Sequence, residues 1–142
     1  MRQISTFAVA ILAPAALAAG PAAGEEYSTE KVDVVTSIVA EGLDHPWGLD
    51  FLPDGMAIVT ERSGTLRLVN ADGTLSEPVT GVPEVSARGQ GGLLDVAVAK
   101  DFAQSGRIFF TFSEPGTGGA GTAIAGARLV RDGAAARLED MR

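Results

Sequence analysis

Cysteine is absent from the 142-residue sequence, and histidine occurs once. Without cysteine the chain can form neither a disulfide framework nor a thiolate metal site. A lone histidine cannot build a zinc site unless cysteines or clustered carboxylates complete the ligand set. Basic residues are also few, 11 against 18 acidic ones, and the net charge is -7. Because such a surface repels phosphate groups, we expect no nucleic-acid partner and no electrostatic docking on anionic lipid.

Acidic residues are missing from the first 24 positions. Arg2 is followed by an uncharged, mostly apolar stretch over residues 4–19, with small-residue cleavage sites at 16–18 and 22–24. This layout is typical of a secretory signal peptide, and the run is short and interrupted by proline for a membrane span. We predict that residues 1–24 are a cleaved signal peptide and that the mature protein is periplasmic or secreted. An uncleaved anchor is the alternative.

Long helices are disfavoured, because 18 glycines and 7 prolines punctuate the chain. Short runs of alternating apolar and polar residues recur instead, as at Val32 and Val34 and at Leu66 and Leu68. Such alternation predicts half-buried strands. A third run predicts one buried strand face, formed by Ile108, Phe110 and Phe112. Turn residues separate the runs, so we predict an all-β fold.

The runs form a larger repeat in two halves. Leu49-Asp50 leads into a predicted strand at 56–60, and Leu94-Asp95, 45 positions later, leads into one at 107–112. Two further strand-like runs follow in each half, at 65–70 and 77–80 and at 123–130 and 136–139. Four strands every 40 to 50 residues are typical of β-propeller blades. A β-sandwich with evenly spaced hairpins is the alternative.

A propeller needs about four to eight blades to close its ring, whereas this sequence supplies about two. We therefore expect residues 25–142 to be the N-terminal part of a β-propeller domain in a longer protein. The alternatives are a two-blade protein that associates with itself and a truncated reading frame without a function of its own.

The segment Gly89-Gln90-Gly91-Gly92 is the best candidate for a binding site. Its glycines permit positive φ angles or a close approach to the backbone. The Gln90 amide offers both a donor and an acceptor, which suits a ligand with carbonyl and carboxylate groups. The segment precedes the predicted first strand of the second blade, where propeller loops converge on the axis. The alternative is a tight turn with an exposed glutamine.

The other motifs give weaker indications of a binding or catalytic site. We expect His45 to hydrogen-bond locally at the start of a strand above Trp47, rather than to act as a general base. The glycine-rich stretch 115–122 lacks the Lys-Ser/Thr ending of a phosphate loop, so we expect a long flexible hairpin loop. Residues 70–73 predict a turn, because their spacing does not match a calcium loop. A Gly-x-Ser-x-Gly nucleophile motif is absent.

Two blocks of sequence carry a family resemblance. The first contains Gly-Leu-Asp-His-Pro-Trp-Gly-Leu at 42–49, Phe-Leu-Pro-Asp-Gly at 51–55, Val-Thr-Glu-Arg-Ser-Gly at 59–64 and Leu-Arg-Leu-Val at 66–69. The second contains Val-Pro-Glu-Val at 82–85 and Gly-Gln-Gly-Gly-Leu-Leu-Asp-Val-Ala at 89–97. On these blocks, the chain from about Val39 to its end resembles the soluble PQQ-dependent aldose sugar dehydrogenases, also called glucose/sorbosone dehydrogenases.

The resemblance implies a six-bladed propeller, of which about two blades are present. It implies PQQ bound near the axis, assisted by calcium, with a histidine that takes the proton of the sugar's anomeric hydroxyl while hydride passes to the quinone. It assigns Gln90 to cofactor binding. The family's catalytic histidine, arginines and calcium ligands lie beyond residue 142, so no catalytic or metal-binding residue is assigned here.

We therefore expect the isolated chain to be inactive, with an aldose sugar as the substrate of the whole protein. One position departs from the family pattern: Lys100 replaces the usual proline before Asp101-Phe102, which we expect to alter only a surface turn. A non-enzymatic exported propeller that binds carbohydrate or protein is the alternative function, because propellers host many functions. The sequence does not indicate which sugar or which electron acceptor is used.

Overall fold

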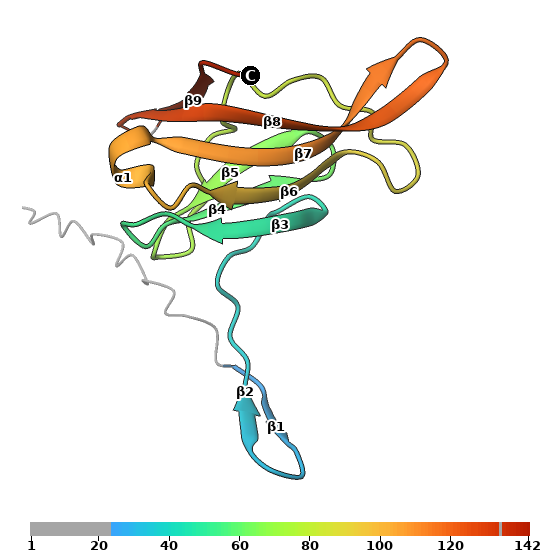
Figure 1. The fold of residues 1–142 in the computed structure, drawn as a ribbon. Helices are drawn as coiled ribbons and strands as arrows, with labels where there is room; N and C mark the ends of the chain where they lie inside the picture. Colours follow the sequence, from blue (N-terminus) through green and yellow to red (C-terminus); the bar gives the residue numbers. More distant parts are fainter. Residues whose placement is uncertain (1–23, 134) are drawn as a thin grey trace, which may run out of the picture. The chain divides into compact units, whose positions relative to one another are not determined.

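The computed structural model describes residues 24–133 and 135–142 (Figure 1). The predicted signal peptide, residues 1–24, lies outside the described residues except for Gly24. The described chain forms two compact units, which divide between Ile38 and Val39. No helix in these described ranges is long and apolar enough to cross a bilayer.

The first unit is a short β-hairpin. Strands β1 (Glu26–Ser28) and β2 (Asp33–Val35) pair antiparallel, with Tyr27 opposite Val34. The Thr29 hydroxyl donates a hydrogen bond to the Val32 carbonyl at 2.6 Å and closes the turn. The predicted alternation at Val32 and Val34 falls on this hairpin, but both side chains are exposed. The hairpin is therefore held by local hydrogen bonds rather than by a core.

The second unit contains two antiparallel sheets. The first sheet has the order β3 (Pro46–Phe51), β4 (Ala57–Glu61) and β5 (Thr65–Val69). The second has the order β6 (Leu93–Val98), β7 (Arg107–Gly116), β8 (Gly119–Asp132) and β9 (Ala135–Glu139). A single helical turn, α1 (Phe102–Ser105), precedes β7. The described chain is nearly all-β, as predicted.

The hydrophobic core lies between the two sheets. Ile108, Phe110 and Phe112 are buried on one face of β7, as predicted, whereas Phe109 on the other face is 42% exposed. The first sheet contributes Ile58, Leu66 and Leu68 to the same core, and the second adds residues from β6, β8 and β9, which are Leu93, Val96, Ala125, Ala127, Leu129, Ala136 and Leu138. The alternating pattern of the sequence therefore identified the buried faces of β5 and β7 correctly.

The predicted strand at 77–80 does not form a regular ladder. Val79 donates its N–H to the Leu66 carbonyl at 2.8 Å, so this segment runs beside β5. Pro78 has no N–H and cannot extend the ladder. Thr80 instead bridges in parallel to Arg137 of β9, and this pairing joins the outer edges of the two sheets.

The stretch at 115–122 forms the predicted hairpin, but the predicted long loop is wrong. Strand β7 runs to Gly116 and β8 begins at Gly119, so the turn contains only Thr117 and Gly118. Gly118 has a φ of 89°, which a tight turn requires and glycine permits. A strand ladder is made by backbone groups, so a glycine-rich sequence can continue it without side-chain packing. The resulting hairpin projects at the upper right of Figure 1.

The first two strands of each sheet pair in equivalent registers. A bulge interrupts β3 between Pro46 and Leu49, and the same bulge interrupts β6 between Leu93 and Val96. Leu49 therefore corresponds to Val96, and the predicted match of Leu49 with Leu94 is two positions out of register. The hydrogen-bond ladder determines the true equivalence, whereas a shared dipeptide does not.

Candidate functional site

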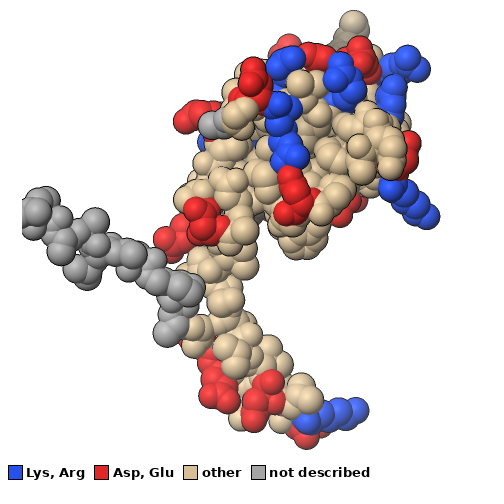
Figure 2. Space-filling model, turned by 90° about the vertical axis from the view of Figure 1, so that its left-hand side faces the viewer, with Lys and Arg blue, Asp and Glu red and all other residues tan. Residues whose placement is uncertain are grey.

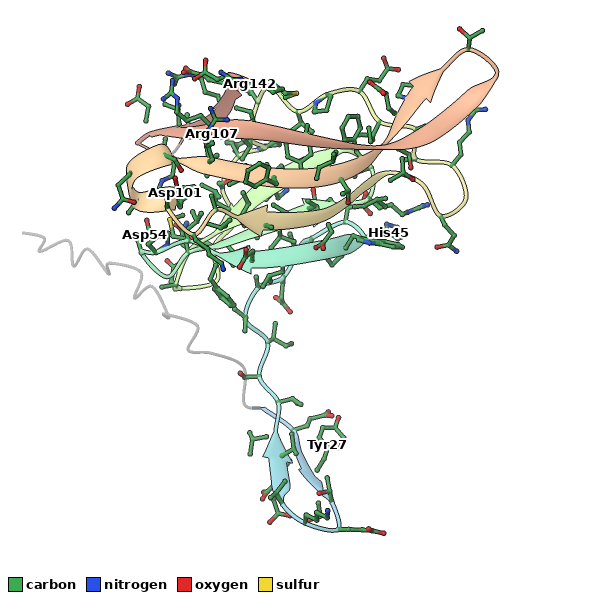
Figure 3. All side chains as sticks on the ribbon, viewed as in Figure 1. Tyr27, His45, Asp54, Asp101, Arg107 and Arg142 are labelled. Atoms are coloured by element: carbon green, nitrogen blue, oxygen red, sulfur yellow. The ribbon has the colours of Figure 1, made fainter. Side chains whose placement is uncertain are left out.

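Three segments meet at one end of the second unit: the start of β3, the turn from Arg62 to Gly64, and the loop that leads into β6. Figure 3 labels His45 at this end, and Asp54, Asp101, Arg107 and Arg142 at the opposite end. The candidate residue Gln90 belongs to the loop before β6 and therefore lies at the end of the unit where β3 and β6 begin.

Gln90 occupies a tight turn. The Gly91 N–H donates to the Arg88 carbonyl at 2.8 Å and closes the turn around Gly89 and Gln90. Gly89 has a φ of 56°, a conformation in which glycine avoids the steric cost of a side chain. The Gln90 side chain is exposed. Its amide can therefore reach a partner outside the chain.

Arg62 holds this turn against the first sheet. Its Nη1 atom donates to the Gly89 carbonyl at 2.7 Å. Its own backbone carbonyl accepts the Leu93 N–H at 3.1 Å, and its backbone N–H donates to the His45 carbonyl at 3.1 Å. One residue thus connects β3, β6 and the Gln90 turn. Sequence reasoning did not single out Arg62, because its only signal is a basic residue directly after a strand.

Gly92 is required by the packing of the chain against itself. A Cβ atom at Gly92 would overlap the Arg62 carbonyl oxygen, and its φ of 145° also disfavours a side chain. The predicted close approach of backbone is therefore present, and the object approached at Gly92 is the turn that carries Arg62. This packing fixes the start of β6 next to the Gln90 turn.

A hollow of about 720 Å³ lies beside the Gln90 turn, between the loop before β6 and the β7–β8 hairpin. Polar groups in its lining come from Glu84, Ser86, Arg88 and Ser113. The Ser113 hydroxyl accepts the Gly92 N–H at 3.2 Å. The exposed Arg88 guanidinium is the cation of this set, and it can pair with an anionic oxygen.

His45 forms the expected local hydrogen bond. Its Nδ1 lies 2.5 Å from the Asp44 carboxylate, and the His45 side chain is 71% exposed. The strand β3 begins at the next residue, as predicted, while Trp47 keeps 51% of its surface exposed. One nitrogen of the imidazole is therefore occupied by its sequence neighbour.

Glu61 anchors the segment that carries His45, and sequence reasoning missed it. Its side chain is 2% exposed at the end of β4. The Oε1 atom accepts the Asp44 N–H at 2.7 Å, and the Arg67 Nε donates to Oε2 at 3.2 Å. A buried carboxylate is stable when it is both paired and hydrogen-bonded. No local sequence signal indicates this role, because it requires three segments to meet.

Residues that could hold a metal ion do not cluster in the part of the chain that the structure describes: no group of three or more His, Cys, Asp or Glu side chains is placed to do so. Lys100, the departure from the family pattern, is exposed in the turn before α1, as expected.

Comparison with known proteins matches this arrangement to one family. The family model for glucose/sorbosone dehydrogenases matches residues 43–142. An aldose sugar dehydrogenase of Escherichia coli is 53% identical over 102 residues, which cover 70% of this chain and 27% of that protein. The chain thus spans little more than a quarter of this curated relative.

Solved structures show the same likeness. The soluble aldose sugar dehydrogenase from Escherichia coli in its apo form is 50% identical, with a TM-score of 0.68 over 74% of this chain and 30% of that one. The PQQ-bound form of aldose sugar dehydrogenase from Streptomyces coelicolor is 30% identical, with a TM-score of 0.61 over 80% and 31%. These structures confirm the prediction of β-propeller blades.

Proposed function

Because the chain belongs to the glucose/sorbosone dehydrogenase family, we propose that it is the N-terminal part of an exported quinoprotein that oxidises aldose sugars at the anomeric carbon. The observation that carries this proposal is the family match over residues 43–142, which includes the Gln90 turn. Since the chain spans only 27% of its Escherichia coli relative, the activity is proposed for the whole protein.

The residues near Gln90 fit PQQ as the cofactor. PQQ, when bound, supplies a quinone that accepts hydride from the sugar. A quinone bearing carboxylates needs neutral donors and cations, and this end of the unit presents the exposed Gln90 amide beside the exposed Arg88 guanidinium. In our proposal Gln90 donates an amide N–H to a cofactor oxygen and orients the ring. Gln90 takes no proton, because an amide is not a base at neutral pH.

Arg62 is proposed as a positioning residue for Gln90. Its guanidinium binds the carbonyl of Gly89, the residue directly before Gln90. Holding the turn before the cofactor arrives lowers the entropic cost of binding. No catalytic base is assigned to this chain, because the resemblance places the family's histidine beyond residue 142, and no calcium ligand is assigned, because no group of three or more His, Cys, Asp or Glu side chains in the described residues is placed to hold a metal. Proton abstraction and calcium binding are proposed for the remaining blades.

Export is proposed from the N-terminal sequence. Arg2, the uncharged stretch at 4–19 and the small residues near position 24 support a signal peptide. N-terminal sequencing of the protein from the periplasm or medium tests this proposal. A mature N-terminus close to residue 25 is expected, and an intact Met1 would contradict it.

The proposed activity is tested on the full-length protein that carries residues 1–142. The protein is purified without cofactor, and PQQ and calcium are then added in the presence of an aldose and an artificial electron acceptor. We expect acceptor reduction that requires both PQQ and the aldose. Binding of the sugar without any acceptor reduction would contradict the proposal and favour a carbohydrate-binding propeller.

A further inference from the structure

The hollow beside the Gln90 turn is lined by more polar side chains than the cofactor needs from this chain. Arg88 is its one lining residue proposed to meet PQQ, whereas Glu84, Ser86 and Ser113 line the same hollow. Glu84 is exposed, and the two serines are half-buried. The volume of about 720 Å³ is that of a small-molecule site. Three polar side chains are therefore available to a ligand other than PQQ.

Backbone hydrogen bonds fix the two serines relative to each other. The Ser86 N–H donates to the Ser113 carbonyl at 2.8 Å, and the Ser113 N–H donates to the Gly92 carbonyl at 2.8 Å. The Ser113 Oγ accepts the Gly92 N–H at 3.2 Å. A hydroxyl oxygen that accepts one hydrogen bond still has its own hydrogen to donate. Ser113 can therefore donate a hydrogen bond to an oxygen of a ligand in the hollow.

Gly91 keeps the space over these serines open. A Cβ atom at Gly91 would lie 2.6 Å from the Ser86 carbonyl oxygen and 2.8 Å from the Ser113 Oγ, closer than carbon and oxygen pack. The φ angle of Gly91 is not positive, so glycine is needed here for space rather than for its backbone conformation. Any larger residue would occupy the place from which a ligand can reach the Ser113 hydroxyl.

The charge of Glu84 selects the kind of ligand. A carboxylate is an acceptor only, and it repels another carboxylate at close range. PQQ carries carboxylates, so it is disfavoured near Glu84 and is better placed at Gln90 and Arg88. A neutral ligand rich in hydroxyls can donate to Glu84 in a charge-assisted hydrogen bond and accept from Ser113. A sugar ring presents hydroxyls of this kind on neighbouring carbons.

We propose that this hollow is a subsite for a neutral sugar ring. Glu84 accepts hydroxyl hydrogens of the ring, and the Ser86 and Ser113 hydroxyls bind its oxygens. The inference rests on the proposed function and deepens it, because the subsite holds a part of the sugar that does not react. Glu84, Ser86 and Ser113 thus determine specificity for the sugar, whereas Gln90 contacts the cofactor.

Titration of the ¹⁵N-labelled 142-residue chain with methyl β-D-glucopyranoside tests the subsite. The methyl group of this probe blocks oxidation at the anomeric carbon, so binding is measured without reaction. We expect saturable amide shifts at Ser86, Gly91 and Ser113 at millimolar probe. The amides of Asp101 and Arg107, at the opposite end of the unit (Figure 3), should not shift.

Glu84→Gln tests the carboxylate, with Glu77→Gln at another exposed position as the matched control. We expect Glu84→Gln to weaken probe binding about tenfold, because a charge-assisted hydrogen bond is replaced by a neutral one. Glu77→Gln should bind the probe as the wild type does. Gln90→Ala should also bind it normally, because the Gln90 amide is assigned to PQQ.

Three results would overturn the proposal. The first is a titration without saturable shifts at Ser86 and Ser113. The second is equal binding of the probe by Glu84→Gln and Glu77→Gln. The third is tighter binding of glucuronate than of the neutral probe, which would mean that Glu84 does not select the ligand. The titration needs neither PQQ nor an electron acceptor, so it can fail while the dehydrogenase assay succeeds, and the reverse.

Discussion

The Gln90 amide is exposed, yet its backbone is fixed by the Gly91–Arg88 hydrogen bond and by Arg62. A side chain of this kind can be replaced without disturbing the core. In the full-length protein we expect Gln90→Ala to weaken PQQ binding about tenfold, the loss of one hydrogen bond of about 1.4 kcal/mol. Fluorescence titration with PQQ measures the effect. Gln104→Ala, on α1, is the control and should bind PQQ normally; equal binding by both variants would contradict the role of Gln90.

Glu61 differs from Gln90, because its carboxylate is buried and accepts hydrogen bonds from both Asp44 and Arg67. Glu61→Gln keeps the shape but leaves the guanidinium of Arg67 without its charged partner. We expect this variant to lower the free energy of unfolding by about 2 kcal/mol, in the range for hydrogen bonds to charged groups. Urea denaturation measures the loss. Glu84→Gln, at an exposed position, should be neutral, and an equal effect of both substitutions would refute the anchoring role.

At the scale of elements, an ion pair connects the two sheets at the end away from Gln90. Arg131 Nη1 of β8 lies 2.6 Å from the Asp54 carboxylate in the β3–β4 turn. Within the second sheet, Arg128 contacts both Glu139 and Asp140. Figure 2 shows basic and acidic side chains interleaved on the second unit. The turn between β3 and β4 is therefore tied to a strand of the other sheet.

The Asp54–Arg131 pair predicts a pH dependence. The hydrogen bond from Arg131 lowers the pKa of Asp54 below its ordinary value of 3.8. A depressed folded-state pKa adds stability that is present above pH 3.8 and is lost as the pH falls through the lower, folded-state value. Because the carboxylate is partly exposed, the gain at neutral pH is at most about 1 kcal/mol.

We therefore expect Asp54→Asn to lower the Tm at pH 7 and to make little difference under strongly acidic conditions. Thermal unfolding of wild type and variant across this range measures the difference. Asp132→Asn, the next residue after Arg131, serves as the control. A difference between wild type and Asp54→Asn that stays constant down to the lowest pH would contradict the ion-pair explanation.

At the scale of the whole molecule, the described chain provides only part of the proposed cofactor site. It offers Gln90 and Arg88 at an open end, and among the described residues no group of three or more His, Cys, Asp or Glu side chains is placed to hold a metal ion. We expect the isolated 142-residue chain, supplied with PQQ and calcium, to give no detectable sugar oxidation. The same assay on the full-length protein is the positive control. Turnover by the isolated chain would show that its own residues complete the site.

The fold class could be predicted from the sequence because strand alternation and turn residues are local patterns. Alternation at Leu66 and Leu68 and at Ile108 to Phe112 identified the buried faces, and turn residues identified the strand ends. At 115–122 the hairpin was predicted correctly and the long loop was not, because glycine content indicates permitted conformations and does not reveal that two strands continue to pair. The Leu49–Leu94 match failed for the same reason, since register depends on a partner strand.

The sequence alone determined the all-β class, the family resemblance and the choice of Gln90, and it predicts the signal peptide. These depend on composition, short-range pattern and motif, which are present before the chain folds. Only the tertiary structure decided that Arg62 holds the Gln90 turn, that Glu61 is buried between three segments, and that Thr60 joins two sheets. These roles depend on contacts between segments: those of Arg62 and Thr60 form when the two sheets pack together, and those of Glu61 form when β4 pairs with its neighbours in the first sheet.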